Sequence, residues 1–169
     1  MTFRVSDKVS RFHTGATDQV RFRPATTGGA ALKQHSETLR IDTRRGLTSI
    51  TEGVRQVLGR AGVREGLCTL FVRHTSASLV IQENADPDVR RDLESFLSRL
   101  VPDGDPMFTH TAEGPDDMPS HVKAALTRTS EQIPVHGGEL VLGTWQGLYL
   151  WEHRDARQRR EVFVHVIGE

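Results

Sequence analysis

The sequence predicts one antiparallel-rich α+β domain with about three inserted helices. Its 169 residues match the usual length of a single domain. Several segments with strand character follow one another through short loops, and the helical segments are inserted among them rather than placed after every strand. A doubly wound parallel sheet needs strands and helices in regular alternation, so these observations favour an antiparallel arrangement.

Residues 1–36 differ in composition from the rest of the chain. Up to Lys33 this stretch carries six basic residues against two acidic ones, and it sustains neither a helical nor a strand period. A segment that cannot bury apolar surface stays unfolded. We therefore expect a flexible basic extension over residues 1–36 and a folded domain over residues 37–169.

The first elements of the folded part are a strand and a helix. Residues 38–42 alternate polar and apolar side chains, which predicts a strand. Ser49 and Glu52 have the spacing of a capping box, and apolar residues then recur at helical intervals. Gly62 is suited to end this helix.

Two strands, over residues 67–74 and 78–82, precede the clearest helix signal in the chain. Asp86 is suited to cap this helix, and Pro87 fits its first position. One apolar stripe runs along the helix and consists of Val89, Leu93, Phe96, Leu97 and Leu100.

The last part of the chain predicts one helix and four strands. The helix begins near Pro119 and is expected to face the core with Val122, Ala125 and Leu126. The strands lie roughly over residues 131–134, 139–142, 148–153 and 161–167. The Gly137–Gly138 pair marks a turn, and the charged segment 155–160 is expected to bridge a hairpin.

The composition excludes several classes of protein. Lys plus Arg and Asp plus Glu both number 22, so no excess of positive charge indicates a nucleic-acid partner. No apolar run is long enough to cross a membrane, and the N-terminus lacks the apolar stretch of a secretory signal. Cys68 is the single cysteine, so no internal disulfide can form, and its apolar neighbours predict a buried thiol. Together these observations predict a cytoplasmic protein.

Polar residues gather in four stretches, of which the first two are short. In residues 74–78, His74 is either a structural histidine with a satisfied ring or a ligand or base, and the hydroxyl residues beside it could cap a turn or hold an anion. In residues 82–86, a strand exit followed by a helix cap explains most side chains. Glu83 is the exception, because it has no structural role that the sequence reveals.

The strongest stretch is residues 110–121, which holds two imidazoles and three carboxylates. Imidazole is the commonest metal ligand in proteins, and a neighbouring carboxylate fixes its tautomer. Asp116 and Asp117 are adjacent, and neighbouring carboxylates raise each other's pKa, which could keep a proton donor near neutral pH. A helix cap at Asp117 and a solvated Asp116 would explain these carboxylates but neither histidine. The stretch therefore favours a functional site, although its spacing matches no zincin-type motif.

The fourth stretch, residues 143–154, places two glycines around Thr-Trp-Gln between two predicted strands. Glycine permits a tight turn or the close approach of the backbone to a ligand. Packing in a core or an interface would explain Trp145 and Trp151. The segment 152–154 could be a solvated strand end or a ligand with its charge partners.

These four stretches, in this order, resemble the YjbQ family, the secondary thiamine-phosphate synthase family. The resemblance rests on HTSASLVIQENADPDVRRDL, HTAEGPDDMPSH, SEQIPVHGGELVLGTWQGL and GTWQGLYLWEHR, and it covers about residues 37–169. It implies a compact α+β fold with a large antiparallel sheet or sandwich. It also implies a homotrimer whose clefts lie near subunit contacts.

The resemblance further implies a weak or secondary thiamine-phosphate synthase activity, which joins a pyrimidine diphosphate to a thiazole phosphate and releases pyrophosphate. It implies a divalent metal, zinc, with magnesium as the alternative for a diphosphate substrate. The implied metal ligands are His110, His121 and His153. The implied catalytic residues are His74, Glu83, Asp116 and Asp117. The implied substrate-binding residues are Ser76, Asn84, Gly114, Thr144, Trp145, Gln146 and Arg154.

Two functions therefore remain open for the predicted site. The first is a metal-dependent enzyme that acts on a phosphorylated small molecule. The second is a non-catalytic trimeric module that binds a metabolite or an anion in the same cleft. Metal content and turnover distinguish the two.

Overall fold

The computed structural model describes residues 31–169, so residues 1–30 of the predicted extension lie outside the described residues. The first strand, β1 (Lys33–Thr43), begins ahead of the boundary predicted at residue 37. It pairs along its whole length with the last strand, β8 (Gln158–Gly168). The strand predicted over residues 38–42 is therefore the second half of a longer one.

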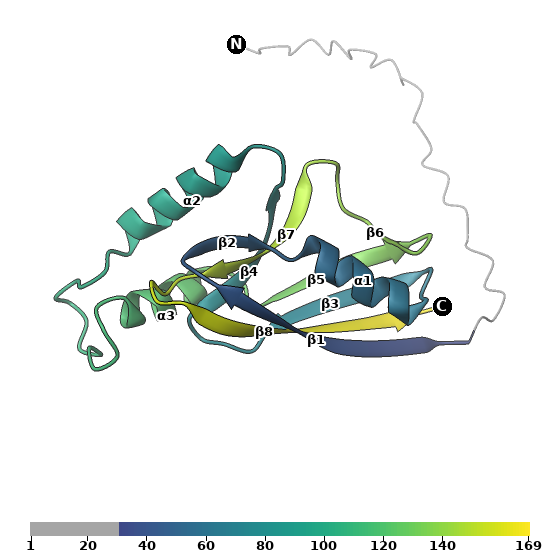
Figure 1. Ribbon diagram of the computed structural model, residues 1–169, viewed down its shortest axis with the longest axis horizontal. Coiled ribbons are helices and arrows are strands. Elements are labelled where there is room, and N and C mark those ends of the chain that lie inside the picture. Colours follow the sequence, from purple (N-terminus) through teal and green to yellow (C-terminus); the bar gives the residue numbers. More distant parts are fainter. Residues whose placement is uncertain (1–30) are drawn as a thin grey trace, which may run out of the picture.

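The remaining elements follow in the predicted order, with one additional short strand, β2. Their bounds are β2 (Gly46–Ser49), α1 (Thr51–Ala61), β3 (Gly66–Val72), β4 (Ala77–Glu83), α2 (Pro87–Leu100), α3 (Asp117–Leu126), β5 (Ser130–His136), β6 (Glu139–Leu140) and β7 (Gln146–Glu152). The strands form a five-stranded sheet in the order β1-β8-β3-β5-β6 and a three-stranded sheet in the order β2-β7-β4 (Figure 1). Every strand pairing is antiparallel, which confirms the predicted fold class.

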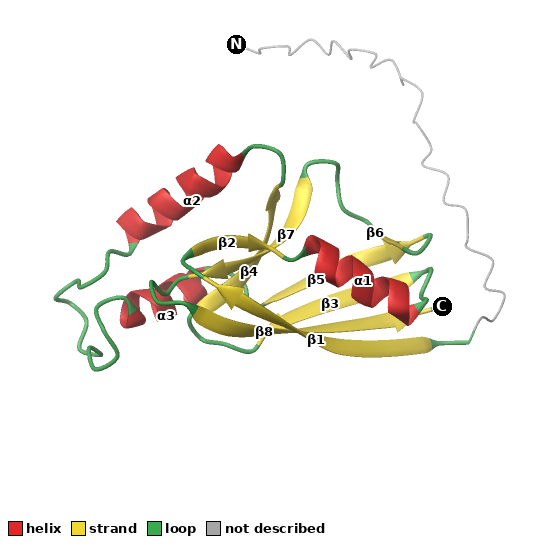
Figure 2. Cartoon of the chain, in the orientation of Figure 1, coloured by secondary structure: helices red, strands yellow, loops and turns green. Residues whose placement is uncertain are grey.

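One hydrophobic core joins α1 to both sheets. Figure 2 shows α1 lying over the five-stranded sheet, and its residues Val54 and Val57 are fully buried. Alternate residues of β3 point into the same core, as the period of a half-buried strand requires. One of them is Cys68, whose thiol pKa is raised to about 11 by burial. The predicted buried thiol is confirmed.

The predicted capping box at the start of α1 is wrong. The helix has Ile50 at its N-cap and no side-chain capping bond. Ser49 is the last residue of β2, where it pairs with Tyr149 of β7. The Ser49 hydroxyl donates to the Thr51 hydroxyl at 3.5 Å and caps no backbone amide of the helix, and Glu52 instead accepts a hydrogen bond from Gln56.

Helix α2 begins as predicted, but its apolar stripe does not face a core within the chain. The Asp86 side chain accepts a hydrogen bond from the Asp88 amide at 2.8 Å, which confirms the predicted cap. Of the stripe only Leu97 is buried, and Phe96 and Leu100 are 59% and 57% exposed. Figure 1 shows the reason, because α2 projects away from the two sheets.

Helix α3 turns a different face inward than the sequence predicts. Val122 is only partly buried, Ala125 is exposed and Leu126 is 60% exposed. Polar residues such as Ser120 and Lys123 are buried instead. The apolar pattern was misleading here because this helix packs its polar side against the end of the three-stranded sheet.

The charged segment 155–160 does not bridge a hairpin. Strand β7 pairs with β2 and β4, whereas β8 pairs with β1 and β3, so the segment carries the chain from one sheet to the other. Charge and turn propensity mark a connection without showing which strands pair. The crossover brings the end of β7 close to β8 and to the start of β4, and the polar site is built there. No helix within residues 31–169 combines the length and apolar character needed to span a bilayer.

Candidate functional site

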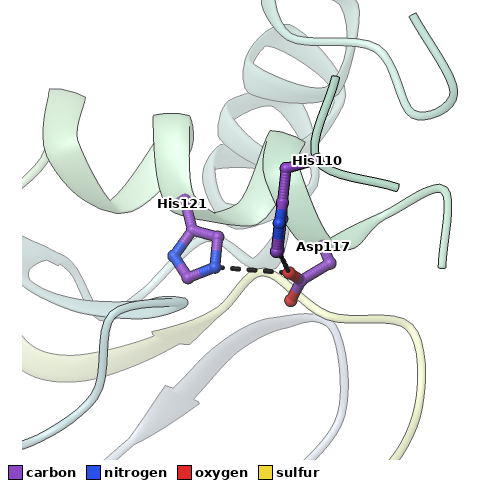
Figure 3. A group of neighbouring side chains, drawn as sticks. All are labelled: His110, Asp117 and His121. Atoms are coloured by element: carbon purple, nitrogen blue, oxygen red, sulfur yellow. Dashed lines mark hydrogen bonds and ion pairs between the residues drawn. The ribbon is translucent and has the colours of Figure 1, made fainter. Parts of the chain in front are cut away.

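Two histidines and one aspartate converge at the start of α3. Asp117 and His121 lie one helical turn apart and therefore share a side of the helix, and His110 reaches them from the preceding loop (Figure 3). The His110 Nε2 atom lies 2.8 Å from Asp117 Oδ2, and the His121 Nε2 atom lies 3.3 Å from the same oxygen. The potential ligand atoms of the three side chains all lie within 4.8 Å of one another. We refer to these three residues as the His–Asp–His cluster.

The ring of His121 is oriented by the backbone. Its Nδ1 atom lies 3.0 Å from the carbonyl oxygen of Thr75. Because a carbonyl can only accept a hydrogen bond, Nδ1 carries the hydrogen, and the Nε2 atom of a neutral ring is left with its lone pair. That lone pair faces Asp117 Oδ2, which is a second acceptor. Two acceptors held 3.3 Å apart are stabilised by a cation between them, a proton or a metal ion, so this donor set fits a metal.

Asp117 is held in place by Arg154. The carboxylate is almost fully buried, and its Oδ1 atom accepts a hydrogen bond from Arg154 Nη1. The same guanidinium donates to Asp116 Oδ2 at 3.0 Å and to the carbonyl oxygen of Glu113 at 2.8 Å. Arg154 thus donates hydrogen bonds to the loop and to the cluster. In this structure Arg154 holds Asp117 in place, and its predicted role in binding substrate stays a prediction.

Asp116 lies beside the cluster as a carboxylate and not as a proton donor. Burial by itself would raise its pKa, but hydrogen bonds from the Asp155 amide and from Arg154 outweigh burial and lower the pKa of Asp116 overall. The prediction that adjacent carboxylates keep a proton near neutral pH is therefore wrong for Asp116. The reason is tertiary, because Asp155 and Arg154 follow β7, far away in sequence.

His153, the third predicted metal ligand, lies outside the cluster. It is 1% exposed, and its Nε2 atom lies 2.9 Å from the hydroxyl of Ser78. Burial, with the charge of Lys123 nearby, lowers the pKa of His153 to about 3. His153 is therefore a neutral ring in the interior. Its Nδ1 atom is buried without a hydrogen-bond partner among the described residues.

His74 lies near the cluster but has no free lone pair in this arrangement. Its Nε2 atom accepts a hydrogen bond from the Glu161 amide at 2.9 Å, so a neutral ring carries its hydrogen on Nδ1. Burial, together with the charge of Arg160, lowers the pKa of His74. The ring can donate a hydrogen bond from Nδ1, which favours ligand binding over the predicted role as a base. Ser76, predicted to bind substrate, is buried and accepts a hydrogen bond from Arg160 at 3.0 Å.

Arg160 and Glu152 form a buried ion pair beneath this region. Two guanidinium nitrogens of Arg160 lie 2.6 Å from the two oxygens of Glu152, and both side chains are nearly inaccessible. The sequence pattern does not indicate this pair, because Arg160 ends a run of charges that is typical of a solvated loop. The available signal was its place at the start of the alternating segment that continues into β8.

The remaining predicted residues lie at the other end of the β4–β7 pair. Ala77 pairs with Glu152 near the cluster, and Glu83 pairs with Gln146 at the far end. Six strand steps put the two ends about 20 Å apart. The far-end group consists of Glu83, Asn84, Thr144, Trp145 and Gln146. Within one chain these residues do not join the His–Asp–His cluster.

The far-end residues hold a turn together. The amide of Asn84 donates to the carbonyl oxygens of Thr144 and Gln146, each at 3.1 Å. The Gln146 side chain accepts a hydrogen bond from the Gly143 amide at 2.8 Å, and Trp145 is 65% exposed. Gly114 likewise serves a turn, since its φ of 109° is open only to glycine at low cost.

The fold and the cluster define a small α+β protein with a potential metal-binding group at the end of its smaller sheet. A family model described as "UPF0047 protein YjbQ-like" matches residues 35–169, and the chain belongs to this family. A UPF0047 protein of Synechocystis sp. is 53% identical over 144 residues, covering 85% of this chain and 98% of the relative. The YjbQ protein of Escherichia coli O157:H7 is 42% identical over 137 residues, covering 80% and 99%.

Solved structures agree with the fold. A YbjQ-like protein from Sulfolobus solfataricus P2 matches with a TM-score of 0.75 at 26% identity, covering 82% of this chain and all of that one. A hypothetical protein from Aeropyrum pernix K1 matches with a TM-score of 0.71 at 28% identity, covering 79% and 98%. The expected family membership is confirmed.

Proposed function

We propose that this chain is a metal-dependent enzyme that acts on a phosphorylated small molecule. The observation that carries the proposal is the convergence of two imidazole nitrogens on one buried carboxylate oxygen, at 2.8 and 3.3 Å. His110, Asp117 and His121 would hold the metal. Arg154 fixes Asp117, and the Thr75 carbonyl fixes the tautomer of His121, as supporting residues around metal sites commonly do.

The donor set favours zinc over magnesium. Zinc is commonly bound by imidazole nitrogen together with carboxylate oxygen, whereas magnesium prefers oxygen ligands alone. A bound zinc ion would act as a Lewis acid toward an oxygen of the substrate or a bound water. Three protein ligands, rather than four, leave room for such a group.

For the reaction we propose a thiamine-phosphate synthase type of transfer, as a weak or secondary activity. A pyrimidine diphosphate loses pyrophosphate, which leaves with the bonding electron pair, and a ring nitrogen of a thiazole phosphate forms the new bond. Both substrates are phosphorylated, and the departing pyrophosphate develops negative charge that a metal and cationic side chains stabilise. The family resemblance supports this reaction type, and the donor set of the cluster supports its metal dependence.

Metal analysis of the purified full-length chain tests the first part. We expect about one zinc ion per chain, lost when His121→Ala removes one ligand. The matched control is His136→Ala, because the side chain of His136 at the end of β5 is 80% exposed and, within residues 31–169, forms an ion pair with Glu65 alone. Equal zinc content in the two variants would contradict the proposed metal site.

Turnover tests the second part. The zinc-loaded protein is incubated with the pyrimidine diphosphate and the thiazole phosphate, and thiamine phosphate is measured. We expect product from the wild-type chain and from His136→Ala but not from His121→Ala. Saturable binding of both compounds without product would instead support the non-catalytic binding module.

We also propose the homotrimer that the family resemblance implies. Phe96 and Leu100 of α2 and Met107 in the following loop are more than half exposed, and apolar side chains of this size favour burial against another chain. The native mass in solution tests this proposal, and a monomeric mass would contradict it.

A further inference from the structure

A polar cavity of about 560 Å³ lies near the His–Asp–His cluster, and none of the three cluster residues lines it. It lies where β3 ends and the chain turns toward β4. Its polar lining consists of Arg73, His74, Thr75, Ser76, Thr129 and Arg160. Two more lining residues are apolar, and none is acidic. A concave site lined by cations and hydroxyl groups without a carboxylate is suited to an anion.

The donors of this cavity are not all equally available. The charge of Arg160 is neutralised by Glu152, and Arg160 also donates a hydrogen bond to the Ser76 hydroxyl. Arg160 and Ser76 are therefore held in place and are not free to turn toward a ligand. Arg73 is different, because its side chain is 59% exposed and its guanidinium has only a loose ion pair with Glu161 at 3.6 Å. Arg73 can therefore turn toward a ligand without breaking a buried contact.

His74 and two threonines complete the set of available donors. The His74 Nε2 atom is occupied by the Glu161 amide, which leaves an Nδ1–H group without a partner among the described residues. Thr75 and Thr129 are both exposed, and their hydroxyl groups can donate from either side of the cavity. One guanidinium, one imidazole N–H and two hydroxyls suit the several oxygens of a phosphate group better than the two of a carboxylate.

The cavity continues toward the cluster. A second cavity of about 290 Å³ is lined by His74, Thr75, Thr129, His121 and two alanines of α3. Three of these residues also line the larger cavity, so the two are neighbours along one path that ends at His121. A ligand with its anionic group near Arg73 would extend along this path to the cluster.

We propose that Arg73, His74, Thr75 and Thr129 form the subsite for a phosphate group of the substrate. The binding of phosphate at this subsite does not depend on the proposed function. Only the expectation that the rest of the substrate extends toward the His–Asp–His cluster rests on it. Arg154, which the family resemblance implies as a substrate-binding residue, does not line this cavity and hydrogen-bonds Asp116 and Asp117 instead. The subsite contains no ligand of the proposed metal.

Phosphate binding to the full-length chain tests the subsite. Inorganic phosphate and pyrophosphate are titrated calorimetrically into metal-free protein at constant ionic strength. Arg73→Met is compared with Arg40→Met, which is the matched control because Arg40 is 60% exposed and also pairs with Glu161, at 3.1 Å, but does not line the cavity. We expect Arg73→Met to weaken binding about tenfold, as loss of one charge-assisted contact does, and Arg40→Met to change it less than about twofold.

A variant that keeps the charge unchanged separates the subsite from general electrostatics. Thr129→Val removes one hydroxyl on an exposed site and should weaken phosphate binding about threefold. Acetate at equal concentration should not compete with phosphate. The proposal is overturned if the two arginine variants bind phosphate equally, if metal-free wild-type protein binds none, or if acetate competes as well as phosphate.

The same titration on His121→Ala distinguishes this inference from the proposed function. If that variant loses zinc but keeps phosphate binding that depends on Arg73, both the metal site and the subsite stand. If it keeps its zinc while phosphate binding still depends on Arg73, the metal site fails and the subsite stands. If phosphate binds only when zinc is present, the anion sits on the metal and the subsite is wrong.

Discussion

Replacing Arg160 by Met should strongly destabilise the protein. Arg160 is paired with Glu152 through two contacts of 2.6 Å, and their side chains are 7% and 0% exposed. Removing one partner of a buried ion pair leaves the other charge without compensation, which typically costs about 3–5 kcal/mol. For a chain of this length, each kcal/mol lowers the melting temperature by about 2–4 °C, so we expect a loss of about 6–20 °C.

The loss should depend on pH with a defined sign. Burial by itself raises the pKa of Glu152, but hydrogen bonds from Arg160, the Arg154 amide and Thr43 outweigh it and lower the pKa from the usual value of 4.5. A lowered pKa contributes stability above pH 4.5 that is lost as the pH falls toward the folded-state value. The difference between wild type and Arg160→Met should therefore be largest near neutral pH and should narrow below pH 4.5.

Urea unfolding at one fixed protein concentration, followed by far-UV circular dichroism, measures this difference. Arg60→Met is the matched control, because Arg60 also makes two contacts with one carboxylate, that of Glu37, but at the surface. Surface pairs add little stability, so this control should unfold almost like the wild type. The double variant Arg160→Met/Glu152→Gln should recover part of the loss. Equal effects of the two single arginine variants would refute the reasoning.

Two further predictions concern stability and are measured by the same unfolding experiment. Gly59 lies in α1, and a methyl group added there would have no atom within 4 Å, so Gly59→Ala should stabilise the protein by about 0.4–1 kcal/mol. A methyl group on Gly66 would overlap the carbonyl oxygen of Ile167, so Gly66→Ala should destabilise it by about 1–3 kcal/mol. A stability change of the same sign in both variants would contradict this account. Lys123→Met should stabilise the protein by about 1–3 kcal/mol. The Lys123 ammonium is buried with no hydrogen-bond partner within residues 31–169, and Asp103, 3.5 Å away, would remain paired with Arg45 at 2.6 Å. A loss of stability would show that the Lys123–Asp103 pair is favourable.

Local patterns predicted most of the elements correctly. The start of α2 was predictable because an aspartate cap followed by proline acts within a single turn, and Asp86 and Pro87 take the predicted positions. The Gly137–Gly138 turn was also predictable from local residues, because glycine adopts positive φ at low cost. Both residues do have positive φ. The capping box at Ser49 failed because a four-residue strand, too short for a visible period, competes for the same residue.

The candidate site was predictable in part. Asp117 and His121 lie four residues apart, so a helix that begins at Asp117, two residues ahead of the predicted start near Pro119, places both on one side. His110 follows from its place in the same short loop. The structure brings these three together, as the histidine-rich stretch indicated.

The sequence by itself determined the order of strands and helices, the family and the local half of the cluster, because these depend on interactions within a few residues. Only the tertiary structure decided that His153 is buried in the interior and that Arg154 hydrogen-bonds Asp116 and Asp117. It also decided that the predicted site residues fall at opposite ends of the β4–β7 pair. Each of these depends on which strands pair and where the chain crosses between the sheets. That choice is made by packing across the whole core, and no single segment encodes it.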